Sequence, residues 1–249
     1  MKKKLTRRPT SAIAWLLPVV LLISNQCETY VDIDYEPQLN VFGILSNAQQ
    51  RQEILVDRTY QIEEPTGPVI DDALVILSRD DLFDTLEFSI PDVRYISSPF
   101  TLVPEGTYDI MVSSDGFDTL RGATTIPGNF TIFFPGYGDT LTFQDTITLS
   151  RSEGAQLYSV AFSQSAGGFG PFTWHESQPS DTIVQIPVAD YWEEALEGYY
   201  TIYIASYDNN FYEYYLVEGD SIKQAGVTGG VGLFGSTWIR TTSTYVLFQ

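Results

Sequence analysis

Residues that could carry out catalysis are few and scattered along the chain. The sequence has one histidine, His175, and one cysteine, Cys27. A serine triad or a histidine-ligated zinc site would depend on His175. The sequence contains no G-x-S-x-G motif and no second histidine that could complete either arrangement. We therefore predict no catalytic residues and a structural role for His175.

Carboxylates are abundant, because the chain holds 32 Asp and Glu residues. A glycosidase needs two carboxyl groups roughly 5–10 Å apart across a cleft, but adjacent residues of a strand point to opposite faces. Solvated charge is the favoured interpretation, and a hydrolase built on scattered carboxylates is the third hypothesis. Calcium is the one cofactor left open, because Asp208-Asn209-Asn210 or Asp80-Asp81 could supply oxygen ligands. The acidic doublets are Glu63-Glu64, Asp71-Asp72, Asp80-Asp81 and Glu193-Glu194.

Gly230, Gly232 and Gly235 have the G-x-G-x-x-G spacing of a dinucleotide-binding turn. That motif works at the start of a helix, where N-terminal amides hold a pyrophosphate. Here it is followed by Thr237–Phe248, which is rich in β-branched and aromatic residues. A turn or bulge with close backbone packing is therefore predicted.

The N-terminus is typical of an export signal followed by a lipid anchor. A basic start precedes the apolar run Ala12–Ile23, which is short for a membrane span and contains Pro18. Cys27 directly follows this run, in the position of a lipobox cysteine, although Gln26 replaces the usual small residue before it. We predict that Cys27 is lipidated; the alternative is an uncleaved anchor helix.

The charge of the chain excludes several classes of partner. Without residues 1–26 it has 8 Lys and Arg against 32 Asp and Glu, a formal charge of −24. Nucleic acids and anionic lipid head groups are bound through basic patches, which this composition does not provide. Cations and basic protein surfaces are better candidates.

Aromatic residues are the strongest binding signal. Tyrosine and phenylalanine recur between Tyr199 and Tyr215, and Trp174 lies nearby in the sequence. Exposed rings could stack on sugars or anchor a protein, whereas cross-strand packing of paired strands explains the same run. The ligand-binding candidates are Trp174, Tyr203, Tyr207, Tyr212 and Tyr214.

The elements that would position these residues are mostly strands. Alternating apolar runs separated by turn residues predict two β-sandwich-like domains in an all-β fold. One short helix is predicted over Tyr191–Glu197, since Asp190 and Glu193 suit a capping box, and a loop is predicted over Ala166–Pro171. The predicted organisation is a signal peptide at 1–26, a lipid-anchored tether at 27–37, an N-terminal β-sandwich domain at 38–128 and a C-terminal β-rich domain at 129–249. The expected strands of the first half are Leu39–Leu45, Glu53–Tyr60, Ala73–Ser78, Thr85–Ser89, Tyr108–Val112 and Thr119–Ile126.

The sequence resembles the Bacteroidota lipoprotein family labelled domain of unknown function forty-two forty-nine. The likeness is carried by Leu39–Asn47, by Asp71–Val75 with Gly106-Thr107-Tyr108, and by Gly229–Gly235. The resemblance implies an exported lipoprotein that begins with an immunoglobulin-like or transthyretin-like sandwich and is often found beside TonB-dependent outer-membrane receptors. It implies no catalytic residues.

The leading hypothesis is a non-enzymatic lipoprotein of the cell envelope, anchored at the outer membrane and bound to a protein partner there, with a TonB-dependent transporter as the candidate. The runner-up is a carbohydrate-binding surface lipoprotein that uses exposed aromatic rings on a glycan.

Overall fold

The computed structural model describes residues 35–60, 69–164, 169–191, 197–217 and 224–247. The predicted signal peptide, Cys27 and most of the tether lie outside these residues. Within the described part of the chain, no helix has the length and apolar character needed to cross a membrane. The fold class is confirmed, because the described residues form three β-sheets and very little helix.

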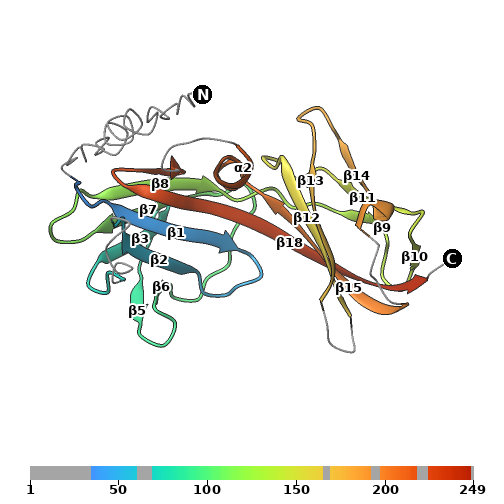
Figure 1. Ribbon diagram of the computed structural model, residues 1–249, viewed down its shortest axis with the longest axis horizontal. Helices are drawn as coiled ribbons and strands as arrows, with labels where there is room; N and C mark the ends of the chain where they lie inside the picture. The colour runs from blue at the N-terminus through green and yellow to red at the C-terminus, as the bar shows by residue number, and fades with distance from the viewer. Residues whose placement is uncertain (1–34, 61–68, 165–168, 192–196, 218–223, 248–249) are drawn as a thin grey trace, which may run out of the picture. The chain divides into compact units, whose positions relative to one another are not determined.

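The largest sheet has ten strands and runs through both halves of the chain (Figure 1). Its order is β13-β12-β15-β18-β1-β2-β6-β5, and β10 and β16 pair additionally with β18. The strands are β1 (Leu39–Ser46), β2 (Glu53–Arg58), β5 (Glu87–Ser89), β6 (Arg94–Ile96), β10 (Thr140–Thr142), β12 (Leu157–Gln164), β13 (Phe169–Glu176), β15 (Gly198–Tyr207), β16 (Gln224–Ala225) and β18 (Val231–Leu247).

A five-stranded sheet packs against the β1 and β2 part of the large sheet. Its order is β17-β8-β7-β3-β4. One apolar cluster lies between the two sheets, with Val41 and Ile54 contributed by the large sheet and Val75 and Ile110 by the smaller one. Alternation of apolar and polar residues directs these side chains to one face of each strand. The strands of this sheet are β3 (Leu74–Arg79), β4 (Leu82–Thr85), β7 (Thr107–Ser113), β8 (Leu120–Thr125) and β17 (Val227–Thr228).

A three-stranded sheet of order β14-β11-β9 packs against the β12 and β15 part of the large sheet. Val160 and Ile202 from the large sheet meet Ile147 and Val184 from the small one in a second apolar cluster. The strands are β9 (Ile132–Phe134), β11 (Thr146–Ser150) and β14 (Ile183–Pro187), and a 3-10 helix, η2 (Val188–Tyr191), follows β14.

Strand β18 connects the two apolar clusters. Its first part pairs in parallel with β1, and its last ten residues before Leu247 pair with β15 in antiparallel register. Trp238, near the middle of β18, packs against both clusters. The first cluster also takes in Val227 and Phe234 from the C-terminal half. Residues 37–249 form one compact unit. The predicted domain boundary at 128–129 stays a prediction.

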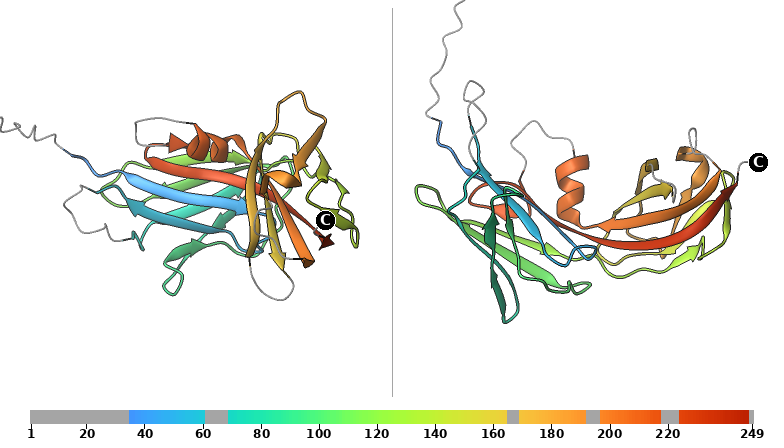
Figure 2. Two further views of the ribbon diagram at one scale, coloured as in Figure 1. Left: turned by 45° about the vertical axis from the view of Figure 1, so that its right-hand side comes forward. Right: turned by 90° about the horizontal axis from the view of Figure 1, so that it is seen from below.

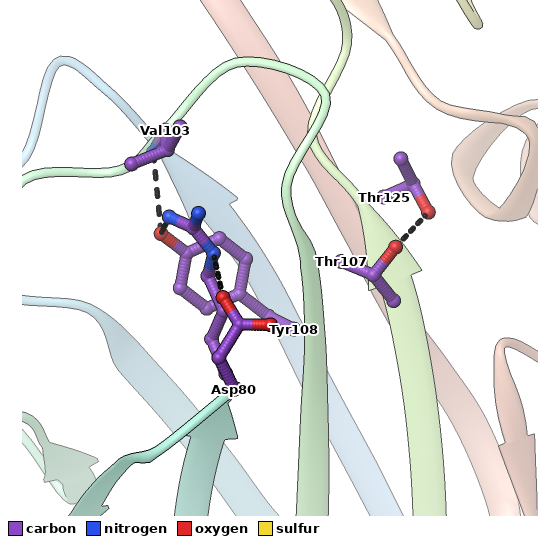
Figure 3. Close-up of polar contacts among 6 residues, drawn as sticks. Asp80, Val103, Thr107, Tyr108 and Thr125 are labelled. Atoms are coloured by element: carbon purple, nitrogen blue, oxygen red, sulfur yellow. Dashed lines mark hydrogen bonds and ion pairs between the residues drawn. The ribbon is translucent and has the colours of Figure 1, made fainter.

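Glycine beside an acidic residue is typical of turns and favours a turn at each end of β7, and both turns are present. Glu105 and Gly116 have φ angles of 62° and 86°, as the Pro104-Glu105-Gly106 and Ser114-Asp115-Gly116 turns require. Figure 3 shows the first turn, where the Val103 N–H donates to the Tyr108 hydroxyl at 3.2 Å and the Thr107 and Thr125 hydroxyls lie 2.9 Å apart. These contacts fix the start of β7 beside β8.

The α-helix that the structure describes is not the predicted one. Residues 192–196 of the predicted helix lie outside the described residues, and the described α-helix is α2 (Asn209–Leu216). Figure 2 shows α2 standing against one face of the large sheet. The predicted loop over Ala166–Pro171 also needs correction, because Phe169–Pro171 begin strand β13.

Candidate functional site

An aromatic surface covers the face of the large sheet that points away from the two main clusters. Strand register places Trp174 opposite Ser159 and Phe172 opposite Ala161, and it places Ala161 opposite Tyr203. Side chains alternate between faces, so these residues project on the side opposite to Val160 and Ile202. On the same side, a third small apolar cluster packs Leu157, Phe211, Ala225 and Leu233 beneath α2.

Seven rings on this side form an unbroken chain of contacts, which we call the aromatic face. Phe172 meets Trp174 at 5.0 Å between centroids, and Trp174 meets Tyr207 at 5.3 Å. Tyr207 stacks on Phe211 at 4.2 Å, and Phe211 contacts Tyr215 at 4.6 Å. The chain ends with Tyr215 to Tyr214 at 5.2 Å and Tyr214 to Phe42 at 6.3 Å. Centroid separations of this size are those of attractive aromatic pairs. Strands β13, β15 and β1 and helix α2 each contribute to the aromatic face.

Helix α2 is held on the sheet by its N-cap. The Asp208 side chain accepts a hydrogen bond from the Phe211 N–H at 3.0 Å, and Asn210 donates to the carbonyls of Ala123 and Phe234 at 2.8 Å each. The first bond satisfies one of the free N–H groups at the helix start. Phe211 and Tyr215 are four residues apart and share a helix face. The Phe211 ring lies against Tyr207 and Trp174, and the Tyr215 ring lies against Phe211.

Part of the aromatic face is buried support and part is open to solvent. Phe211 is only 6% exposed, while Phe172 is 53%, Trp174 43% and Tyr215 47% exposed. Leu216 and Val217, which directly follow Tyr215 at the end of α2, are also exposed. Contiguous exposed apolar surface on a folded protein marks an interaction site more often than isolated apolar residues do.

Acidic groups border the aromatic face. The Tyr212 hydroxyl donates to Glu176 at 3.3 Å, and Asn209 donates to Glu213 at 2.6 Å. The negative charge of Glu176 raises the pKa of Tyr212, and burial raises the pKa of Tyr207. Both tyrosines therefore carry neutral hydroxyls at pH 7. Strands β12, β13 and β15 and helix α2 contain no Lys or Arg.

Asp208 and Asp80, from the two segments that could bind calcium, make contacts within the protein. Asp208 is 4% exposed and caps α2, and Asp80 lies 3.3 Å from the Arg79 guanidinium in the turn between β3 and β4 (Figure 3). Arg79 also lies 5.6 Å from the ring centroid of Tyr108. In the described ranges, no three His, Cys, Asp or Glu side chains gather as metal ligands.

The glycine motif packs backbone against backbone. Gly232 has a φ of +111°, and a Cβ atom there would lie 2.0 Å from the Val41 carbonyl oxygen. The residues after it continue as strand β18. Close backbone packing was predicted at this motif and is confirmed.

A hollow of about 500 Å³ lies elsewhere, where β17 pairs with β8. Its ionisable lining residues are Asp109 and Arg121, which carry opposite charges. This hollow brings together neither a carboxylate pair nor a histidine with a nucleophile.

Comparison with known proteins defines the family. The family model described as Domain of unknown function (DUF4249) matches residues 28–230. The chain belongs to this family. The matched range contains Leu39–Asn47 and Asp71–Val75, but of Gly229–Gly235 it contains only the first two residues. No curated protein matches this DUF4249 chain.

Three solved structures with similarity to this DUF4249 chain are the following. Chicken CNTN1 FN1-FN3 domains are 12% identical, with a TM-score of 0.23, 86% of this chain covered and 68% of that chain. Dpr11 IG1 bound to DIP-gamma IG+IG2 is 8% identical, with a TM-score of 0.24 and coverages of 86% and 100%. Titin domains I67–I69, in an E-to-A mutated variant, are 10% identical, with a TM-score of 0.22 and coverages of 86% and 65%.

The structure brings together four of the five predicted ligand-binding residues. Trp174, Tyr207 and Tyr214 belong to the aromatic face, and Tyr212 lies at its acidic border. Tyr203 projects from the same side of β15 and is 44% exposed. The prediction that this run lies on paired strands is wrong beyond Tyr207, because Tyr212 and Tyr214 are on α2.

Four residues of the aromatic face were not among the predicted ligand-binding residues: Phe42, Phe172, Phe211 and Tyr215. Phe172 carried a usable signal, since it alternates with Trp174 in the pattern of a strand. Phe42 carried none, because it reaches the site through the pairing of β1 with β18, which joins residues nearly 200 positions apart in the sequence.

Proposed function

We propose that this chain is a non-enzymatic, lipid-anchored binding protein of the cell envelope, and that its aromatic face binds a protein partner at the outer membrane. The observation that carries the proposal is the chain of seven rings whose outer members, Phe172, Trp174 and Tyr215, are about half exposed. Rigid aromatic side chains dominate the energetics of protein interfaces, because they bury much area at low entropic cost.

The arrangement of the rings favours a protein over a flat ligand. Phe172 and Trp174 meet at 89° and Trp174 and Tyr207 at 59°, so the exposed rings present edges and faces in several directions. Such a surface suits side chains that insert between rings. A TonB-dependent transporter is the partner that we propose, in keeping with the family resemblance.

Capture from solubilised envelopes tests the role of the aromatic face. We expect the wild-type chain to recover one partner in near-equal amount, and Trp174→Ala and Tyr215→Ala to lower the yield at least fivefold each. The matched control is Tyr137→Ala, because Tyr137 is 90% exposed in the turn between β9 and β10. Equal recovery by all four chains would contradict the proposal.

A carbohydrate ligand is the second candidate, favoured by the two neighbouring exposed rings of Phe172 and Trp174 on one sheet face. Sugars stack on such rings. Binding to a glycan array that is lost in Trp174→Ala and retained in Tyr137→Ala would establish this function in place of the first.

Membrane attachment through Cys27 has its own test. We expect Cys27→Ser to shift the protein from the membrane fraction to the soluble fraction, because acyl chains supply about 0.8 kcal/mol of membrane binding for each buried CH₂. Mass spectrometry of the wild-type chain should show an acylated Cys27 as the first residue. An intact Met1 or an unmodified thiol would refute the anchor.

A further inference from the structure

Strand β13 is an edge strand of unusual length. It ends the order of the large sheet and, among the described residues, pairs only with β12. It has eight residues, whereas β5 at the other end of the sheet has three and β4, at an edge of the five-stranded sheet, has four. Natural sheets usually keep edges short or place lysine and proline on them, because unpaired N–H and C=O groups attract other strands. Strand β13 has no lysine, and its Pro171 leaves Phe172–Glu176 as an uninterrupted segment.

The register identifies the backbone groups that face outward. The Ser177 N–H donates to the Gln156 carbonyl at 2.9 Å, so this pair is a hydrogen-bonded one. Such pairs alternate with non-hydrogen-bonded pairs along an antiparallel ladder. His175 and Thr173 therefore bond to β12, while the N–H and C=O groups of Phe172, Trp174 and Glu176 point away from it. The Thr173 hydroxyl donates to the Trp174 carbonyl at 3.1 Å, which agrees with this orientation.

The residues with outward backbone groups also supply the exposed part of the aromatic face. Phe172 and Trp174 carry the exposed rings, and Glu176 is an exposed carboxylate that accepts from Tyr212. A strand placed beside β13 would thus gain main-chain hydrogen bonds and side-chain contacts from the same three residues. Main-chain bonds supply affinity in strand addition, and the alternate side chains supply specificity.

Charge restricts the sequence of such a strand. The elements around this edge, β12, β13, β15 and α2, carry Glu176 and Glu213 and no Lys or Arg. The whole chain has a formal charge of −19. An acidic strand would be repelled, whereas Arg and Lys side chains can pair with Glu176 and lie over the rings of Trp174 and Phe172.

We propose that the partner binds by strand addition: an extended, basic segment of a protein pairs with the outer edge of β13 at Phe172–Glu176. This inference rests on the proposed function and names the chemistry of its partner.

Hydrogen exchange of the full chain in detergent tests the pairing directly. The probes are an octapeptide of alternating Arg and Thr and its counterpart with Glu in place of Arg. At millimolar concentration the basic peptide should slow exchange at the amides of Phe172, Trp174 and Glu176 at least tenfold, since each gains an acceptor. The amides of Thr173 and His175, already bonded to β12, should change little, and the acidic peptide should have no effect. Unchanged exchange with both peptides, or equal slowing by both, would overturn the proposal.

Two substitutions at one position separate strand addition from simple docking on the rings. Trp174→Ala removes the ring, while Trp174→Pro removes the ring and the outward N–H without breaking a bond to β12. In capture from solubilised envelopes, the Trp174→Pro variant should recover at least fivefold less partner than the Trp174→Ala variant. Thermal unfolding midpoints of the two variants will show whether both are folded. If both variants are folded and lose equal amounts of recovered partner, strand addition is refuted and binding through the aromatic face is supported. Recovery by both at the wild-type level would refute the proposed function itself.

Discussion

Replacing Gly232 with alanine is expected to destabilise the protein by about 4 kcal/mol or more, a cost that few single substitutions reach. The φ of +111° is unfavourable for any residue with a Cβ, and the added methyl would lie 2.0 Å from the Val41 carbonyl oxygen. Both residues belong to the parallel pairing of β1 with β18, so relief of the clash would separate these strands.

Gly116→Ala is the matched control for this substitution. Gly116 also has a positive φ, of +86°, but a Cβ added there would have no atom within 4 Å. Alanine there should cost only about 1–2 kcal/mol, from backbone strain alone. Urea denaturation followed by circular dichroism measures both values. Similar losses in the two variants would show that β1 and β18 are not held as closely as the structure indicates.

The substitution Asp208→Asn is expected to stabilise the protein at pH 7 by up to about 3 kcal/mol. Burial raises the pKa of Asp208 from 3.8 to about 6, against the lowering effect of its hydrogen bond with Thr124. A difference of this size corresponds to roughly 3 kcal/mol between the two protonation states. Asn is neutral at every pH and is as good an N-cap as Asp.

The hydrogen-bonding groups around Asp208 favour a neutral side chain at this position. Thr124 Oγ1 lies 2.6 Å from Asp208 Oδ2 and 2.9 Å from Ser236 Oγ, and Ser236 Oγ donates to the Thr125 carbonyl at 3.0 Å. Each hydroxyl has one proton, so the two hydroxyls can satisfy only two of these three contacts. A protonated Asp208 supplies the third, and the side-chain NH₂ of Asn would do the same.

The raised pKa of Asp208 makes the stability of the protein depend on pH. Since the folded pKa lies above the unfolded one, the contribution of Asp208 to stability is fully present below about pH 4 and is lost as the pH rises to about 6. The stability difference between Asp208→Asn and wild type should therefore be small near pH 3.5, grow to about pH 6 and stay constant above it. Urea midpoints of both chains from pH 3.5 to 8 provide the measurement. A constant difference across that range would show that folding does not raise the pKa of Asp208.

Local pattern was enough to predict the longer strands of the first half. Alternating residues such as Val41 and Leu45, or Ile202 and Ile204, pack on one face wherever the strand is placed, so their burial follows from spacing alone. Turn residues were equally informative, because Glu105 and Gly116 lie where the chain must reverse. The position of α2 was missed because Asp208-Asn209-Asn210 resembles an oxygen-rich loop. The structure identifies Asp208 as an N-cap through the hydrogen bond that it accepts from the Phe211 N–H.

The sequence by itself therefore determined the β-rich class, the turns and the aromatic residues, since each depends on neighbours in the chain. Tertiary structure decided which rings meet and which strand is left at the edge. Phe42, Trp174 and Tyr214 become one surface only because β18 pairs with β1 on one side and β15 on the other. Pairing between residues so far apart depends on the summed packing of both apolar clusters, which no short stretch of sequence contains.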